Sequence, residues 1–291
     1  MNQVVRNIFL ASLLLVCAPL SAAVVVEDDL GRRVELPKPA QRIISLAPHI
    51  TENLFSAGAG DKVVGVVSYS NFPEQALNIA SVGSYKQFNL EAIAALQPDL
   101  IVAWRSGNGM AKIQQLIDLG FTVYVTEPAT LDLIPTSIER YAALVDASAA
   151  AQPVVQTYRD KLAALRARYS QQSPVSVFYQ VWNQPLQTLN GEHLISDVIR
   201  LCGGRNVFAD AKALAPRVGV ESILVADPQV IIASGMGESR PEWLDEWLQW
   251  PSLQAVTQQH LYFVPPDYVQ RHTLRILVGA EMMCKHLERA R

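Results

Sequence analysis

Aromatic side chains lie where an α/β protein would bind a ligand. In both halves of the chain they end an apolar, strand-like segment or lie in the loop that follows it: Tyr69, Tyr85, Trp104, Trp182 and Tyr268. Open α/β sheets bind their ligands at this edge, outside the carboxyl ends of the strands. The pattern therefore indicates a binding site. Phe72 and Phe88 lie in the same loops, and we interpret both as core packing.

The sequence offers little material for covalent chemistry. It contains no Gly-x-Ser-x-Gly elbow, no phosphate-binding loop and no His-Glu-x-x-His motif. The histidines show no paired spacing, so we interpret each as a surface or hydrogen-bonded residue and not as a metal ligand. They are His49, His193, His260, His272 and His286. We expect no catalytic residue, no metal and no cofactor, and a secreted metal-dependent hydrolase is the weakest alternative.

One phrase occurs twice in the chain. "LEAIAALQPDLIVAW", residues 90–104, aligns without a gap with "VESILVADPQVIIAS", residues 220–234. Each reads as a helix, a proline that ends it (Pro98, Pro228) and a buried strand, so the apolar positions follow from helix-on-sheet packing. Glu91 and Glu221 are the second residues of the two repeated segments, and helix-on-sheet packing does not explain why both are glutamate. Stabilisation by the helix dipole, worth about 0.3–1 kcal/mol, is the simple alternative for both.

The surrounding elements alternate between strand and helix. "RIISLA", "KVVGVVSYS" and "LIVAW" are strand-like, whereas "HITENLFSAG" and "NLEAIAAL" read as helices with Thr51 and Asn89 as N-caps. This order predicts a parallel sheet covered on both faces, and it restarts at "VSVFYQV". We predict an N-terminal α/β lobe over 24–133, a bridging helix or helix pair over 134–170 and a C-terminal lobe over 171–291. A long bridging helix predicts little closure between lobes.

The first 23 residues read as a cleavable export signal. Arg6 supplies a positive start, "IFLASLLLV" an apolar stretch and "SAA" a cleavage site, with cleavage expected after Ala23. The apolar stretch is shorter than the roughly 20 residues that a membrane span needs, so we expect no membrane insertion of the mature chain. Lipidation of Cys17 is the minor alternative, because Val16 precedes it where a small residue is preferred.

Export changes the interpretation of the cysteines. Without Cys17 the mature chain keeps Cys202 and Cys284, an even pair that enters an oxidising compartment. We predict one disulfide, and two buried free thiols are the alternative.

The charge balance excludes one class of partner. The chain has 291 residues, half of them apolar, with a formal net charge of −3. A chain of this length and apolar content can form the core of one large domain or of two moderate ones. The absence of a basic field argues against nucleic-acid binding.

Three segments carry a resemblance to a known family: "GVVSYSNFPEQA", "NLEAIAALQPDLIVAWRSGN" and "LCGGRNVF". They resemble the periplasmic cobalamin (vitamin B12)-binding proteins of bacterial ABC importers, from about Arg42 to the C-terminal helix. The resemblance implies two Rossmann-like lobes bridged by a rigid helix, with a corrinoid held between them. It also implies that Tyr69, Tyr85 and Trp104 line one wall, that Asp267 and Tyr268 line the other, and that Cys202 pairs with Cys284.

The resemblance also suggests partners and a departure from the family pattern. In similar proteins a glutamate on each lobe docks onto arginines of a two-fold symmetric permease, and Glu91 and Glu221 fall on those positions. We therefore expect a periplasmic monomer that binds a corrinoid and a permease dimer. Where the family can carry a tryptophan, this chain has Ala215, and Trp182 is a candidate to replace it. Haem or a ferric siderophore is the alternative ligand, although Arg105 and Arg271 are the only obvious arginines for an anionic siderophore.

Overall fold

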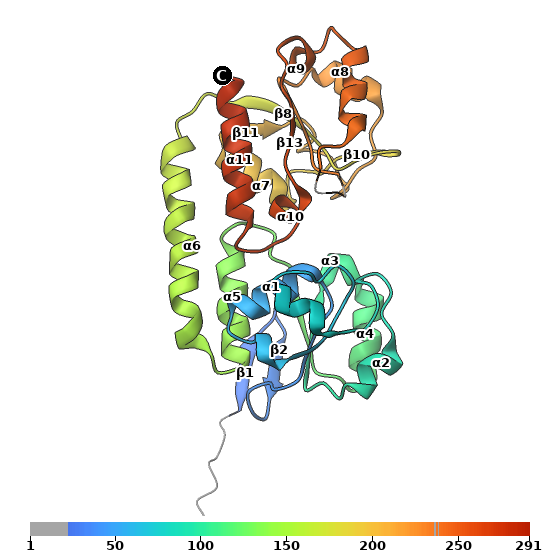
Figure 1. Cartoon of the computed structure of the whole chain (residues 1–291), viewed down its shortest axis with the longest axis vertical. Helices are drawn as coiled ribbons and strands as arrows, with labels where there is room; N and C mark the ends of the chain where they lie inside the picture. The colour runs from blue at the N-terminus through green and yellow to red at the C-terminus, as the bar shows by residue number, and fades with distance from the viewer. Residues whose placement is uncertain (1–22, 236, 238) are drawn as a thin grey trace, which may run out of the picture.

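The chain folds into two α/β lobes that lie end to end, with one long helix along their side (Figure 1). The computed structural model describes residues 23–235, 237 and 239–291. Apart from Ala23, the predicted export signal and Cys17 lie outside the described residues.

The N-terminal lobe is built on a five-stranded parallel sheet in the order β5-β4-β3-β6-β7. Along β3, Ile43 packs with the residues of one face and Ile44 with those of the other, as expected for a sheet covered on both sides. The elements are β1 (Val24–Glu27), β2 (Arg33–Leu36), β3 (Ile43–Ser45), α1 (Pro48–Ser56), η1 (Gly60–Lys62), β4 (Val63–Val66), η2 (Glu74–Asn78), β5 (Ala80–Ser81), α2 (Leu90–Ala95), β6 (Leu100–Trp104), α3 (Arg105–Asn108), α4 (Met110–Asp118) and β7 (Val123–Thr126).

The predicted helix caps have different outcomes. The Asn89 side chain accepts hydrogen bonds from the backbone N–H of Glu91 and Ala92, at 2.9 and 3.1 Å, which confirms it as the N-cap of α2. The prediction for Thr51 is wrong, because α1 begins at Pro48 and contains Thr51. Proline has a backbone angle already suited to the first helical position, so the helix starts four residues earlier, with Ala47 and not Thr51 at the N-cap position.

The C-terminal lobe repeats the architecture with a four-stranded parallel sheet in the order β11-β8-β12-β13. A two-stranded antiparallel hairpin, β9–β10, follows β8. The elements are β8 (Val175–Gln180), β9 (Trp182–Asn183), β10 (Leu186–Gln187), α7 (Leu194–Leu201), β11 (Gly204–Asn206), α8 (Val220–Ala226), β12 (Val230–Ala233), η3 (Glu242–Gln249), α9 (Gln254–Thr257), β13 (Leu261–Phe263), α10 (Pro266–Val269) and α11 (Ile276–Arg289). Together the lobes confirm the predicted α/β fold.

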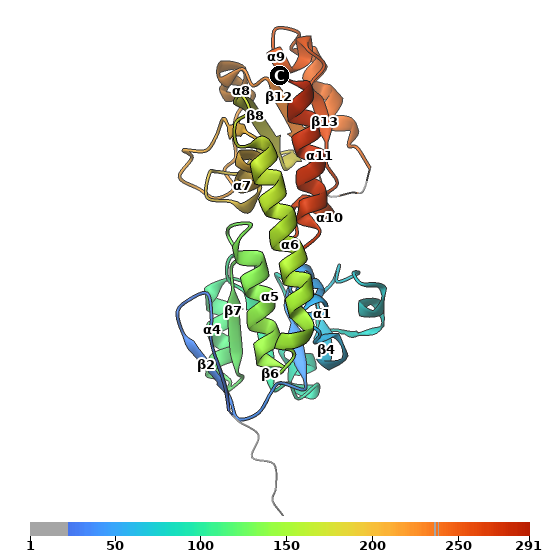
Figure 2. The same cartoon turned by 90° about the vertical axis from the view of Figure 1, so that its left-hand side faces the viewer.

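The segment 134–170 forms a helix pair. Helix α5 (Leu133–Leu144) ends just before Asp146, whose φ of 58° is left-handed and does not continue a helix. Helix α6 (Ser148–Tyr169) is 22 residues long and passes from the first lobe to the second, as Figure 2 shows from its exposed side. No helix in the described ranges is long and apolar enough to cross a bilayer.

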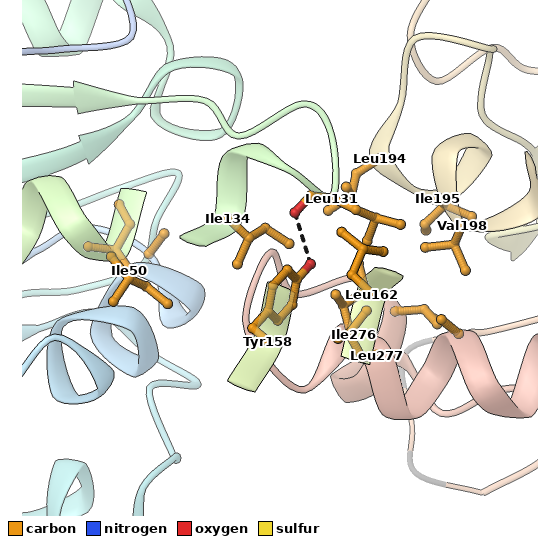
Figure 3. Packing of buried hydrophobic residues seen from close by; sticks show 14 of the residues in the cluster. Ile50, Leu131, Ile134, Tyr158, Leu162, Leu194, Ile195, Val198, Ile276 and Leu277 are labelled. Atoms are coloured by element: carbon orange, nitrogen blue, oxygen red, sulfur yellow. Dashed lines mark hydrogen bonds between the residues drawn. The ribbon is translucent and has the colours of Figure 1, made fainter. Parts of the chain in front are cut away.

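One hydrophobic cluster runs through both lobes. It joins Ile50 of α1 and Ile134 of α5 to Leu162 of α6, and continues to α7 and to Ile276 of α11 (Figure 3). The hydroxyl of Tyr158 on α6 donates to the carbonyl of Leu131 at 2.9 Å inside this packing. Separate outer clusters cover the far face of each sheet. Because the central cluster is shared, the lobes pack on the same helix and on each other.

The disulfide prediction is confirmed. Cys202 follows the end of α7 and bonds to Cys284 of α11 across 82 residues of chain, and both side chains are fully buried. The bond ties the two helices that carry the central cluster into the second lobe.

Replacing Cys202 with Ser should destabilise the folded protein, because the unfolded chain regains the entropy of a long loop. We expect a loss of about 2–4 kcal/mol in the free energy of unfolding, measured by urea denaturation. The matched control is Cys202→Ser with Cys284→Ser, which leaves no unpaired thiol. Two titratable thiols in unreduced, denatured protein would contradict the disulfide.

Candidate ligand-binding site

The two lobes meet at the carboxyl ends of their sheets. In the first lobe, His49 is the second residue of α1, which follows β3, and Trp104 ends β6. In the second lobe, His272 lies in the loop between α10 and α11, after β13. The Trp104 ring lies 5.0 Å from that of His49 and 5.9 Å from that of His272, both edge to face. Residues from separate lobes therefore share one aromatic contact, at the edge where a ligand was predicted.

The predicted residues of the first wall are partly brought together. The rings of Tyr85 and Trp104 lie 5.8 Å apart, and both are half-buried. Tyr69 stands apart in the loop after β4, with 77% of its surface exposed and a left-handed φ of 67°. A bulky residue adopts this backbone angle only at a free-energy cost, so contacts of the surrounding structure must stabilise the conformation of Tyr69.

A single buried amide organises the loops of this wall. The Asn108 side-chain oxygen accepts from the Trp104 backbone N–H at 2.6 Å. Its amide group donates to the carbonyl of Leu46, after β3, and to that of Tyr85, after β5, at 2.9 and 2.7 Å. Asn108 thus ties together three loops at the edge of the sheet. Its place in the segment "WRSGN" was noted from the sequence, but this role was not.

The residues predicted for the second wall, Asp267 and Tyr268, lie on α10. The Asp267 carboxylate pairs with Arg271 at 3.0 Å, and Arg271 donates to the carbonyl of Tyr69 in the first lobe at 3.3 Å. Through Arg271, two predicted site residues from opposite lobes are connected. One further guanidinium nitrogen of Arg271 is buried without a hydrogen-bond partner among the described residues.

Trp182 belongs to the hairpin β9–β10 and is 37% exposed. Its indole N–H donates to the carbonyl of Gln184 in the hairpin's own turn, at 2.9 Å. It is opposite Gln187 in the hairpin register, and Gln187 donates to the carbonyl of Ala215 at 3.2 Å. The structure therefore places Trp182 on a hairpin that contacts the segment of Ala215.

The interpretation of Phe72 as core packing is wrong, whereas that of Phe88 is confirmed. Phe88 packs against the outer cluster of the first lobe. Phe72 is 42% exposed, and the guanidinium carbon of Arg275 from the second lobe lies 4.0 Å from its ring centre. This cation–π contact is a tertiary feature that the local sequence pattern does not contain.

A buried ion pair joins the lobes beside these residues. Arg275 of the second lobe donates to both carboxylate oxygens of Glu52 on α1, at 2.8 and 2.7 Å. The Glu52 side chain is only 2% exposed and that of Arg275 is 20% exposed, so the carboxylate is buried under a two-bond contact with a partly exposed guanidinium. Next to it, the Asn53 amide donates to the carbonyl of His272 at 2.8 Å. We call these contacts between α1 and residues 271–275 the lobe junction.

Three histidines, separated widely in sequence, meet at the lobe junction. The His272 ring lies 5.1 Å from that of His49 and 6.0 Å from that of His193. Burial lowers the pKa of His49 to about 3, with a further contribution from the Arg271 guanidinium, and lowers the pKa of His193 to about 4. Burial also holds the pKa of His272 well below its ordinary value. The folded protein therefore keeps these imidazoles neutral.

This cluster was missed in the sequence, where the histidines show no regular spacing. His49 Nε2 and His272 Nδ1 have no hydrogen-bond partner among the described side chains and backbone. Within the described ranges, no group of three or more histidine, cysteine or acidic side chains is arranged to hold a metal ion.

Glu91 and Glu221 are exposed and occupy the second position of α2 and α8. These two helices lie away from the lobe junction (Figure 1). The repeated glutamates are therefore separate from the aromatic residues of the predicted site.

The chain is similar to known proteins over most of its length. Residues 43–268 match the family model described as periplasmic binding protein. The vitamin B12-binding protein of Vibrio cholerae serotype O1 is 39% identical over 253 residues, which cover 87% of this chain and 91% of that protein. The vitamin B12-binding protein of Yersinia pestis is 35% identical over 248 residues, which cover 85% and 86% of the two chains.

Solved structures agree with this similarity. The periplasmic vitamin B12-binding protein BtuF of Vibrio cholerae superposes with a TM-score of 0.81 at 38% identity, covering 87% of this chain and 98% of that one. The periplasmic haem-binding protein RhuT of Roseiflexus shares the fold, with a TM-score of 0.75 at 21% identity and coverage of 87% and 100%.

The buried histidines predict that acid destabilises the fold. Below the ordinary pKa of about 6.5, the unfolded chain takes up protons that the folded chain excludes until the pH nears the lowered values. The free energy of unfolding should therefore fall as the pH drops from 6.5 to 4.5, by up to about 1.4 kcal/mol per pH unit for each histidine. Above pH 7 these groups should contribute no slope.

Urea denaturation between pH 4.5 and 7.5 measures this slope. In the variant His49→Asn with His272→Asn, the free energy of unfolding should change less steeply with pH than in the unchanged chain. The variant lacks two histidines that take up protons only after unfolding. Both proteins have the same carboxylates, so the contribution of these groups to the pH slope cancels in the comparison. Identical slopes would contradict the assignment of neutral, buried imidazoles.

Proposed function

Because this chain belongs to the periplasmic binding protein family, we propose that it captures cobalamin (vitamin B12) and delivers it to the permease of an ABC importer. The similarity to the vitamin B12-binding protein of Vibrio cholerae carries the proposal. It is 39% identical over 253 residues, a length that includes both lobes of the present chain. A function that depends on residues of both lobes can be shared only by a relative that covers both.

We also propose where the protein is located and which residues the mature chain contains. Residues 1–23 direct export to the periplasm and are removed, and the mature monomer comprises the lobes 24–133 and 171–291 with the helix pair between them. The chain acts as a binding protein and not as an enzyme, and cobalamin is its transported ligand and not a cofactor.

The geometry of the two walls supports a corrinoid. Cobalamin has a large, nearly flat ring with amide groups at its edge, so it suits aromatic surfaces combined with a few polar side chains. Tyr69, Tyr85 and Trp104 supply the aromatic wall of the proposed site. Asp267 and Tyr268 of α10 supply the other wall, with Arg271 paired to Asp267. The contact of the Trp182 hairpin with Ala215 supports Trp182 as the substitute for the missing tryptophan.

The packing also supports capture without large closure. The central hydrophobic cluster and the Glu52–Arg275 pair both cross from one lobe to the other. Moving the lobes apart would expose apolar surface and separate a buried ion pair, and both changes are unfavourable. We therefore propose a site that is largely formed before the ligand arrives.

Haem and ferric siderophores are the alternative ligands. Haem-binding proteins share the fold at about one-fifth sequence identity, and this level of identity supports a common fold but not a common ligand. An anionic siderophore needs several convergent arginines. Arg271 is already paired with Asp267, and Arg105 is exposed on α3, so the charges at this edge favour a ligand with little net charge.

Titration calorimetry with cyanocobalamin, haem and a ferric siderophore tests the ligand. Of these three ligands, we expect only cyanocobalamin to bind. Trp104→Ala should weaken its binding by about 2 kcal/mol, or roughly thirtyfold, because a central aromatic contact is lost. Trp243→Ala, in the outer cluster of the second lobe, is the matched control and should leave affinity unchanged. Tight haem binding without cobalamin binding would reject the proposal.

Glu91 and Glu221 provide a test of delivery. Their exposure and their distance from the lobe junction support docking to the permease instead of capture. Close charge pairs at interfaces can contribute about 1.5–7 kcal/mol, so Glu91→Arg with Glu221→Arg should abolish permease association and uptake. Cobalamin affinity should stay the same, and each single reversal should give an intermediate loss.

Calorimetry and permease pull-down on the same variants separate the two roles. Normal docking of the double variant would leave only the helix-dipole explanation for the repeated glutamates. Parallel loss of docking and ligand binding would also contradict a role confined to delivery.

A further inference from the structure

The indole of Trp104 is held by a carboxylate that the sequence did not single out. Its N–H donates to Glu127 Oε1 at 3.2 Å. Glu127 immediately follows β7, and Trp104 pairs with Thr126 in the parallel register of β6 and β7. The register thus brings the first residue after one strand to the last residue of its neighbour.

Glu127 is itself fixed on two sides. Its Oε2 accepts from the backbone N–H of Ser106 at 2.7 Å, and its Oε1 accepts from the Ser106 hydroxyl at 3.0 Å. Its own backbone N–H donates to the carboxylate of Asp29 at 2.6 Å, and Asp29 pairs with Arg140 on α5. The carboxylate therefore has little freedom to move away from the indole.

The opposite side of the indole has no spare room. A Cβ atom placed on Gly107 would lie 1.9 Å from Cε3 of Trp104 and 2.3 Å from Cζ3, so the ring rests directly on the glycine backbone. The imidazoles of His49 and His272 pack against the same indole, edge to face. Hydrogen bonding and steric contact together restrict the indole to one orientation.

We infer that Glu127 is a positioning residue for ligand capture, because it fixes the orientation of Trp104 before the ligand arrives. The inference rests on the proposed function and goes beyond it by assigning a residue that contacts Trp104 and not the ligand. Ordering a side chain in advance removes an entropic cost that binding would otherwise carry. Without the carboxylate the indole N–H loses its acceptor, and the ring can turn away from Gly107.

The first test compares cobalamin affinity among three variants. Glu127→Ala should weaken binding roughly tenfold, the scale of losing one pre-ordered side chain. Glu127→Gln keeps an acceptor oxygen and should restore most of the affinity. Ser106→Ala leaves the indole bond and the Ser106 backbone bond in place, so it should bind like the unchanged chain. Melting temperatures of the three variants monitor folding.

The second test observes the indole without any ligand. In ¹H–¹⁵N spectra each tryptophan gives one indole N–H signal, and Trp104→Phe identifies the signal of Trp104. Glu127→Ala and Gly107→Ala should both shift this signal and leave the other indole signals in place. They belong to Trp182, Trp243, Trp247 and Trp250.

The two tests give distinguishable failures. An unmoved Trp104 signal in Glu127→Ala overturns the inference directly. Unchanged affinity in Glu127→Ala, when Trp104→Ala weakens binding, overturns it as well. If the unchanged chain does not bind cobalamin, the proposed function fails and the ligand role of Glu127 fails with it, even where the indole signal moves.

Discussion

The hydrophobic cluster along α6 belongs to both lobes and fixes how they are placed against each other. Side chains of α1 and α5 in the first lobe and of α7 and α11 in the second pack into one cluster with α6 (Figure 3). Each lobe has a further cluster of its own on the outer face of its sheet. Separating the lobes would therefore break a continuous core, which is costly because apolar surface would return to water.

This constraint explains the polar character of the lobe junction. With the lobes held together, groups that would be solvated in separate domains become buried: the Glu52–Arg275 pair and the imidazoles of His49 and His272. Such groups need fixed partners or a neutral state, and both are observed. Trp104 and Tyr85 pack at the same edge, so the side chains proposed for capture are supported from both lobes. The exposed Glu91 and Glu221 lie on helices outside this region.

Much of the fold could be predicted from local patterns. The alternation of apolar segments and helices, the stops at Pro98 and Pro228 and the cap at Asn89 are properties of neighbouring residues, and they reappear as two parallel sheets with flanking helices. The cysteine pair could be predicted because only Cys202 and Cys284 lie outside the predicted export signal. The sequence also placed several aromatic residues at the carboxyl edge of the sheet, where the structure brings Tyr85 and Trp104 together and leaves Tyr69 exposed.

The fold class, the repeated halves and the aromatic edge could be read from local patterns, because they follow from the spacing of apolar, capping and strand-end residues. Contacts between side chains that are distant in sequence could not be read in this way. Glu52 and Arg275 are 223 residues apart, and the three clustered histidines share no spacing. Glu127 meets Trp104 only through the register of β6 and β7. Such contacts depend on how the lobes and strands are oriented, and that orientation is set by the whole core and not by any local segment.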